Sequence, residues 1–170
     1  MKKLTLCFAL FICNMLMVNE LWSQVKADAT AVPKLNQLEL VRQFIGKWQS
    51  VVGKDTTDII EYQQFGNAIV SRCNRFIKGK EFPLFALDAG FSAESNQLKV
   101  FVLFGSGDYV TVNCSFKTER KLTGEYLPDF KQDVVLSRFE DEFISPDEYK
   151  STTYDKDGAK IEEVKWTRIK

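Results

Sequence analysis

The stretch FIGKWQS, Phe44 to Ser50, marks the point where the pattern of the sequence changes. Before it, apolar residues recur at helical spacing. After it, apolar and polar residues alternate, which is the period of a half-buried β-strand. Gly46 can adopt the backbone conformations that end a helix, and Trp48 follows two positions later. This Gly-x-Trp predicts that a short helix runs directly into the first strand of a mainly β domain. An ordinary helix stop followed by a core Trp is the alternative.

The residues before Gly46, PKLNQLELVRQFIG at positions 33–46, predict one short amphipathic helix. Pro33 suits a first helical turn, and Gly46 ends the pattern. The apolar residues at helical spacing are Leu35, Leu38, Val41 and Ile45.

The residues after Gly46 predict a chain of short strands joined by tight turns. Segments rich in Val, Ile, Phe, Tyr and Thr are separated by turn signals such as FGN, KGK, GSGD and DKDG. The predicted strands are Trp48–Val52, Thr57–Phe65, Ala68–Ile77, Phe82–Phe91, Gln97–Phe104, Tyr109–Phe116, Lys121–Leu127, Val134–Phe143, Glu148–Tyr154 and Lys160–Ile169. Sequential hairpins favour an all-β fold, an antiparallel up-and-down β-barrel of about eight to ten strands with a short N-terminal helix. A Greek-key sandwich is the alternative, and it needs longer loops.

The first residues, MKKLTLCFALFICNMLMVNELWSQ, have the pattern of a secretory signal peptide. Lys2 and Lys3 precede an apolar run from Leu4 to Val18 that is too short for a membrane span. Ser23 is a small residue that suits cleavage. We therefore expect a signal peptide at 1–23, a flexible arm at 24–33 and a barrel domain at 34–170. The leader is typical of bacteria, and the expected location is secreted or periplasmic.

Composition restricts the classes of function. The chain has 23 basic and 23 acidic side chains, so no basic face for nucleic acid is expected. It has no His, which excludes Ser-His-Asp catalysis and His-ligated zinc or haem. We expect no cofactor, no metal and no integral membrane segment after signal cleavage. We also expect no enzymatic activity, although a carboxylate-based enzyme remains an alternative.

Two of the four cysteines, Cys73 and Cys114, follow the predicted leader. Both lie on apolar faces of predicted strands, with two other strands between them. Strands are ~4.8 Å apart in a sheet, and a disulfide needs Cα atoms within ~7 Å. The strand order therefore favours two buried free thiols over a disulfide.

The elements at the two ends of the domain resemble those of lipocalin-like (calycin) β-barrels. A short helix precedes Gly46-Lys47-Trp48 on the first strand, and Lys165-Trp166-Thr167-Arg168 ends the last strand. The resemblance implies that Trp48 plugs one barrel end and that Arg168 lies across its indole, with Gly46 at the turn. It resembles the small secreted lipocalin-like proteins of bacteria, and it covers the mature domain in pattern but only a few residues in motif.

Alternation along the strands predicts which side chains face the barrel interior. The residues expected to line a ligand site are Val110, Val112, Phe116, Val135, Phe139 and Phe143. Arg72 or Arg138 is expected to turn inwards and bind the carboxylate of a fatty-acid-like ligand, because the guanidinium group matches a carboxylate. Solvent-facing arginines are the alternative.

These residues predict a secreted protein that binds a small apolar or amphiphilic molecule inside its barrel. The alternative function is a packed barrel that binds a protein or glycan on its outer surface. An empty cavity distinguishes the first function from the second.

Overall fold

The computed structural model describes residues 35–131 and 134–170. The predicted signal peptide, the predicted flexible arm and the first two residues of the predicted helix, Pro33 and Lys34, lie outside the described residues. Ten strands follow one short helical segment. They are β1 Gly46–Gly53, β2 Thr56–Phe65, β3 Ala68–Ile77, β4 Lys80–Ser92, β5 Gln97–Phe104, β6 Tyr109–Thr118, β7 Lys121–Leu127, β8 Ser137–Ser145, β9 Glu148–Asp155 and β10 Lys160–Ile169.

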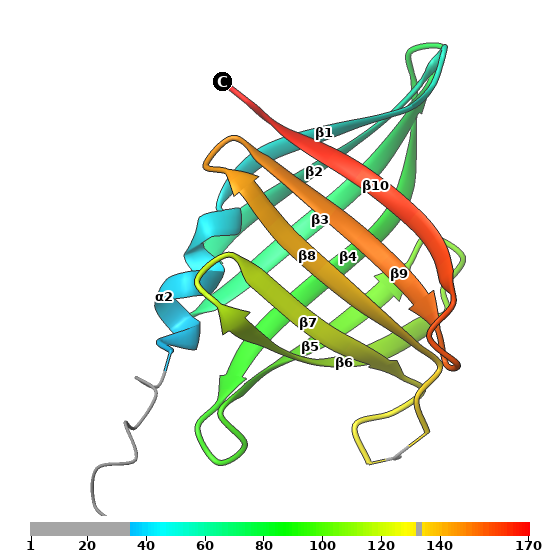
Figure 1. The fold of residues 1–170 in the computed structure, drawn as a ribbon. Helices are drawn as coiled ribbons and strands as arrows, with labels where there is room; N and C mark the ends of the chain where they lie inside the picture. The colour runs from blue at the N-terminus through cyan, green and yellow to red at the C-terminus, as the bar shows by residue number, and fades with distance from the viewer. Residues whose placement is uncertain (1–34, 132–133) are drawn as a thin grey trace, which may run out of the picture. The chain divides into compact units, whose positions relative to one another are not determined.

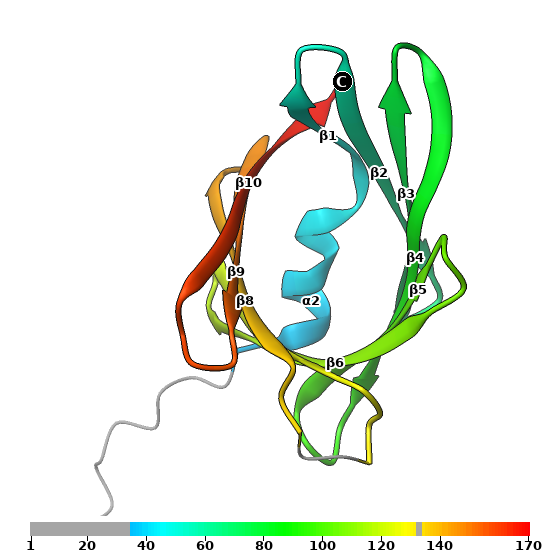
Figure 2. The ribbon, with the colours of Figure 1, turned by 90° about the vertical axis from the view of Figure 1, so that its right-hand side faces the viewer.

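The ten strands form one closed antiparallel barrel, in which each strand pairs with its neighbours in sequence and β1 pairs with β10. Figure 1 shows the strands crossing the barrel at a steep tilt, and Figure 2 shows them as a ring. The predicted all-β, up-and-down barrel with a short helix is therefore confirmed, and the sandwich alternative is wrong. The ring is closed by three residue pairs between β1 and β10, which are Lys47 with Ile169, Trp48 with Arg168 and Gln49 with Thr167.

The strand bounds match the sequence pattern closely, with one clear difference at β8. The prediction placed the start of this strand at Val134, whereas β8 begins at Ser137. Its partner β7 ends at Leu127, and the backbone N–H of Leu136 donates a single bond to Tyr126. The apolar residues before Ser137 therefore look strand-like in the sequence but have no further strand to pair with.

The predicted helix is real but shorter than its periodic pattern. The α-helix α2 spans Gln37–Val41 and continues as the 3₁₀ turn η2, Arg42–Phe44. Asn36 caps its start, since the Asn36 side chain accepts a hydrogen bond from the Glu39 N–H at 3.2 Å. No helix among the described residues is long and apolar enough to cross a membrane.

The helix lies across one end of the barrel, which we call the helix end (Figure 2). Gln37 is buried and acts as a strand partner for β6, because its amide donates to the Phe116 carbonyl at 3.2 Å and accepts from the Phe116 N–H at 2.6 Å. Gln43 donates to the Glu119 carbonyl at 2.9 Å. The helix is thus fixed to the barrel by polar side chains, while Val41 and Phe44 join the core.

The turns divide into two sets because antiparallel strands alternate in direction. Turns 66–67, 93–96, 119–120 and 146–147 share the helix end with α2. The turns at 54–55, 78–79, 105–108 and 156–159 lie at the other end, which we call the loop end, together with the longer segment between β7 and β8. The helix end is covered by α2, so the loop end is the natural entrance to the barrel interior.

Candidate ligand-binding cavity

The barrel encloses a cavity of about 430 Å³. This lies within the range of small-molecule sites, roughly 300–1,000 Å³. Most of its surface is a continuous apolar wall formed by inward residues of β4, β5 and β6. The apolar wall consists of Phe85, Leu87, Ala89, Leu98, Val100, Val102, Phe104, Val110 and Val112. Phe44, from the helical segment, lines the cavity near the helix end.

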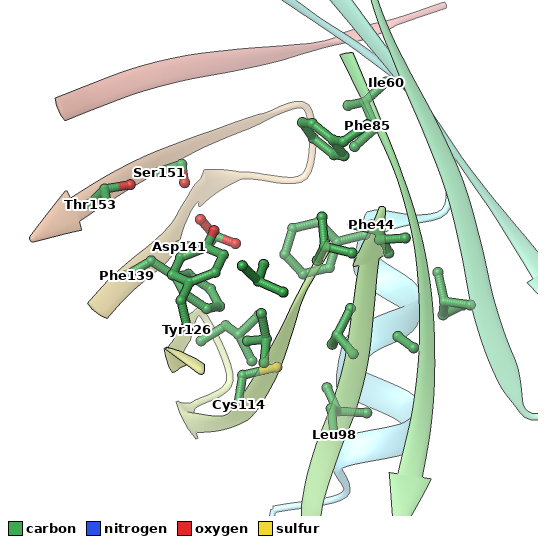
Figure 3. Close-up of a pocket in the computed structure, with 18 of the residues that line it drawn as sticks. Phe44, Ile60, Phe85, Leu98, Cys114, Tyr126, Phe139, Asp141, Ser151 and Thr153 are labelled. Carbon is green, nitrogen blue, oxygen red and sulfur yellow. The ribbon is translucent and has the colours of Figure 1, made fainter. Parts of the chain in front are cut away.

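On β8 and β9, polar side chains line the cavity beside Phe139 and Tyr149. We call Ser137, Asp141, Ser151 and Thr153 the polar stripe. The strand register places Asp141 opposite Ser151, and Thr153 follows two residues later on the same face of β9, opposite Phe139. Figure 3 shows the Asp141 carboxylate next to Ser151 on the adjoining strand, with the rings of Phe139 and Tyr126 close by. The cavity therefore has an apolar wall and a narrow polar side.

Asp141 dominates the electrostatics of the cavity. It is the only Asp, Glu, Lys or Arg among the described residues that line it. Burial disfavours the charged carboxylate and raises the pKa of Asp141 to about 7, while the nearby Ser151 hydroxyl acts in the opposite direction. Its Oδ1 atom is buried and has no hydrogen-bond partner among the described residues. A buried acceptor without a donor is destabilising.

The other ionisable groups near Asp141 are uncharged at neutral pH. Burial raises the pKa of Tyr62, Tyr126 and Tyr149 further above the usual value for tyrosine, and the Asp141 charge adds to each increase. Burial also raises the pKa of the Cys114 thiol to about 12. Asp141 is therefore the group of this set that changes charge between pH 5 and 8.

The helix end is closed by Trp48 and Arg168. The Trp48 side chain is 0% exposed, and its indole N–H donates to the Phe44 carbonyl at 2.6 Å. The Arg168 guanidinium carbon lies 4.1 Å from the centroid of the Trp48 ring. The same guanidinium donates to the carbonyls of Ile45 and Gln43. Arg168 thus binds the indole face and the end of the helical segment together.

Gly46 makes the closure possible for two reasons. Its φ is +122°, a conformation that L side chains rarely adopt. A Cβ atom at this position would also lie 2.7 Å from Nη1 of Arg168. The backbone conformation therefore requires glycine here, and the missing side chain leaves room for the Arg168 guanidinium.

The structure separates the predicted lining residues into two groups. Val110, Val112 and Phe139 line the cavity. Phe116 and Phe143 are buried in the core without lining the cavity. Phe116 lies at the helix end, where Gln37 hydrogen-bonds to its backbone, and Phe143 packs against Phe44 with ring centroids 4.8 Å apart.

Val135 does not belong to the cavity lining. It lies in the segment before β8, whose first residue is Ser137, and it is only half-buried. The prediction failed here because the extra residues assigned to the strand extended the alternating pattern beyond its real start.

The prediction that Arg72 or Arg138 turns inwards is wrong. Both are exposed on the outside of the barrel. On β3, Ser71 and Cys73 point inwards and are buried, so Arg72 between them points outwards. Arg138 pairs with Glu125 at 3.2 Å on the outer face and also donates to the Lys156 carbonyl.

Arg75 is the inward arginine of β3, and it already has a carboxylate partner. Its guanidinium makes two hydrogen bonds to the buried Asp58 on β2, at 2.7 and 2.8 Å. This bidentate geometry satisfies both charges. The Arg75 charge is therefore already paired within the protein and is not available to a ligand carboxylate.

Gly124 on β7 provides space for one cavity side chain. A Cβ atom here would lie 2.4 Å from Cε1 of Phe139 and 2.6 Å from the Cβ of Cys114. The Phe139 ring therefore lies directly over Gly124 and is held against the barrel wall, with Tyr126 beside it at a centroid distance of 5.4 Å.

Sequence reasoning missed Asp141, although the signal was present. Asp141 lies midway between Phe139 and Phe143, so it shares their inward face. In the sequence it stands between Glu140 and Glu142, within a run of three acidic residues that is typical of a solvent-facing segment. Successive side chains of a strand point to opposite faces, so Glu140 and Glu142 point outwards and Asp141, between them, points into the cavity.

The described residues contain no group of three or more His, Cys, Asp or Glu side chains that could hold a metal ion. Cys73 and Cys114 are free and buried, as the strand order predicted. No known protein-family model matches this chain, and a search of the curated proteins finds no similar sequence. The barrel itself is compatible with a calycin-like fold.

Proposed function

We propose that this chain is an exported, lipocalin-like binding protein that holds one small hydrophobic or amphiphilic molecule inside its barrel. The main observation in support of this proposal is the cavity of about 430 Å³ with its apolar wall and polar stripe. Sites for small ligands are mostly apolar and carry a few polar groups that orient the ligand. The Gly46, Trp48 and Arg168 closure supports the lipocalin-like part of the proposal.

The same cavity favours binding over the two alternatives. A packed interaction module has its barrel filled with side chains, whereas this interior leaves space for a ligand. Glycosidase-type catalysis uses a pair of carboxylates. The cavity lining in the described part of the chain contributes one, Asp141.

A fluorescent apolar probe tests the proposal directly. N-phenyl-1-naphthylamine is uncharged at neutral pH and becomes bright in apolar surroundings. We expect saturable binding to the mature protein with one site per chain. We expect Ala89→Phe to abolish or strongly weaken binding, because Ala89 is buried and lines the cavity.

Ala86→Phe provides a matched control for this experiment. It is the same change on the same strand, but Ala86 points to the outer face and does not line the cavity. It should bind the probe like the wild type. Absence of saturable binding, or equal loss in both variants, would contradict binding inside the barrel and would favour the packed module.

Export is tested separately from binding. We expect the full-length chain, expressed in a bacterial host, to be recovered outside the cytoplasm with a new N-terminus near Gln24. Retention of Met1 and the whole leader in a cytoplasmic product would contradict export without affecting the cavity.

A further inference from the structure

The charge distribution inside the barrel is opposite to the one that an anionic ligand needs. Among the described residues that line the cavity, the only charged type present is the carboxylate Asp141. The inward Arg75 is engaged by Asp58 through two hydrogen bonds. Arg168 is engaged at the helix end by the Trp48 ring and two backbone carbonyls. A ligand carboxylate would therefore meet a negative charge and no available cation.

One oxygen of the Asp141 carboxylate lacks a hydrogen-bond donor among the described residues, although the Ser151 hydroxyl lies close enough to lower the pKa of the group. This oxygen, Oδ1, is buried without a partner in the described residues. Two hydroxyl side chains, Ser151 and Thr153, accompany it on the polar stripe, and each can also accept a hydrogen bond. The polar stripe thus gathers acceptors on one side of the cavity.

Aromatic rings stand beside these acceptors. Phe139 and Tyr126 lie close to the Asp141 carboxylate (Figure 3), and Tyr149 also lines the cavity. Aromatic faces attract cations, most strongly where water is excluded. Acceptors and aromatic faces therefore favour the same kind of guest.

We infer that the ligand is a hydrophobic amine, whose protonated nitrogen binds Asp141 and the hydroxyls of the polar stripe while its hydrocarbon part packs against the apolar wall. An ammonium group has three N–H donors when it is primary, and no acceptor, which matches a carboxylate flanked by Ser151 and Thr153. This inference rests on the proposed function, and it specifies the ligand class of that same cavity.

Three ligands of equal chain length test the charge preference. Octylamine is a cation at pH 8, octanol is neutral and octanoate is an anion. We expect calorimetric titration of the mature protein at pH 8 to give the tightest binding for octylamine, at least about tenfold tighter than octanoate. A hydrogen bond to a charged group is worth enough to produce this factor.

Substitution of the carboxylate identifies the group responsible. Asp141→Asn keeps the shape of the side chain and removes its charge. We expect octylamine to lose about tenfold or more in affinity, while octanol changes by less than about threefold. Glu142→Gln removes a charge one position away on the outer face of β8 and should leave all three affinities unchanged.

A pH series on the wild type gives an independent readout. Asp141 becomes protonated as the pH falls from 8 to 5.5, whereas octylamine stays charged. Around Asp141, Tyr126 on β7, Tyr149 on β9, Tyr62 on β2 and Cys114 on β6 remain neutral throughout this range, since burial raises the pKa of each. Octylamine binding should therefore weaken at low pH, and octanol binding should not.

The outcomes separate this inference from the function on which it rests. If N-phenyl-1-naphthylamine binds but octanoate binds as tightly as octylamine, the proposed binding function is retained and the inferred preference for an amine is wrong. Equal octylamine affinity in the wild type and Asp141→Asn also overturns the inference. If neither the fluorescent probe nor octylamine binds, the binding function and the ligand class both fail.

Discussion

Arg168 and Trp48 are cross-strand partners at the seam of the barrel, and the guanidinium carbon of Arg168 lies 4.1 Å from the centroid of the Trp48 ring. One residue lies near the start of β1 and the other near the end of β10, so their contact joins the first strand to the last. The same guanidinium binds the backbone of the helical segment. One side chain therefore connects the seam, the plug and the helix.

A double-mutant cycle on this pair tests its energetic role. Trp48→Ala should reduce the free energy of unfolding by about 3–5 kcal/mol, the range for removing a large buried aromatic side chain. Arg168→Ala should cost less, because its side chain is partly exposed. The two effects should be non-additive, since residues in contact couple. Urea unfolding of the four proteins measures this coupling, and strictly additive losses would contradict the pairing.

Gly124 should tolerate a methyl group poorly. Gly124→Ala places a Cβ atom against Phe139 and Cys114, so the Phe139 ring must move into the cavity. We expect a loss of about 1–3 kcal/mol in the free energy of unfolding, as for overpacked cores, together with weaker binding of N-phenyl-1-naphthylamine.

Gly90→Ala is the control for this prediction. Gly90 is also within a strand, β4, and has nothing within 4 Å of its Cβ position. We expect it to be neutral or slightly stabilising, because alanine loses less backbone freedom on folding than glycine does. If the two variants have equal stability, Phe139 is not held against Gly124.

The stability of the folded protein should depend on pH through Asp141. The folded pKa of about 7 lies above the ordinary value of 3.8, so the folded chain binds more protons than the unfolded chain between these pH values. The contribution of this group to stability is therefore largest below about pH 4, falls as the pH rises and levels off above about pH 7.

Urea unfolding at pH 5 and pH 8 measures this dependence. Relative to Asp141→Asn, the wild type should lose about 2–3 kcal/mol of stability between the two pH values. Glu142→Gln should lose as much as the wild type, because its Asp141 is intact. An identical pH dependence in the wild type and Asp141→Asn would show that the carboxyl is not buried.

The two cysteines should behave as buried thiols in the mature protein. Burial raises the pKa of both Cys73 and Cys114 to about 12, and the thiolate is the reactive form. A thiol reagent such as 5,5′-dithiobis(2-nitrobenzoic acid) should react very slowly with the native protein. In denaturant without reductant it should detect two thiols per chain. Finding none would mean that a disulfide joins β3 to β6.

Local sequence patterns determined most of the fold. The change from helical to alternating spacing at Gly46, and the turn signals between apolar runs, are local features, and they located the helical segment and all ten strands. Closure also followed from sequence, because short sequential hairpins leave two edges that pair most simply with each other. The start of β8 did not follow, because strand pairing depends on where the partner β7 ends.

Only the tertiary structure decided what lies inside the barrel. Parity separates the two faces of a strand but does not say which polar side chain is neutralised by a partner on another strand. Arg75 faces inwards but is engaged by Asp58 on β2, and Arg138 faces outwards to Glu125 on β7. Asp141 has no such partner atom for Oδ1 among the described residues. Contacts between strands that are distant in the sequence therefore decide which charge remains in the cavity. A local sequence pattern does not contain this information.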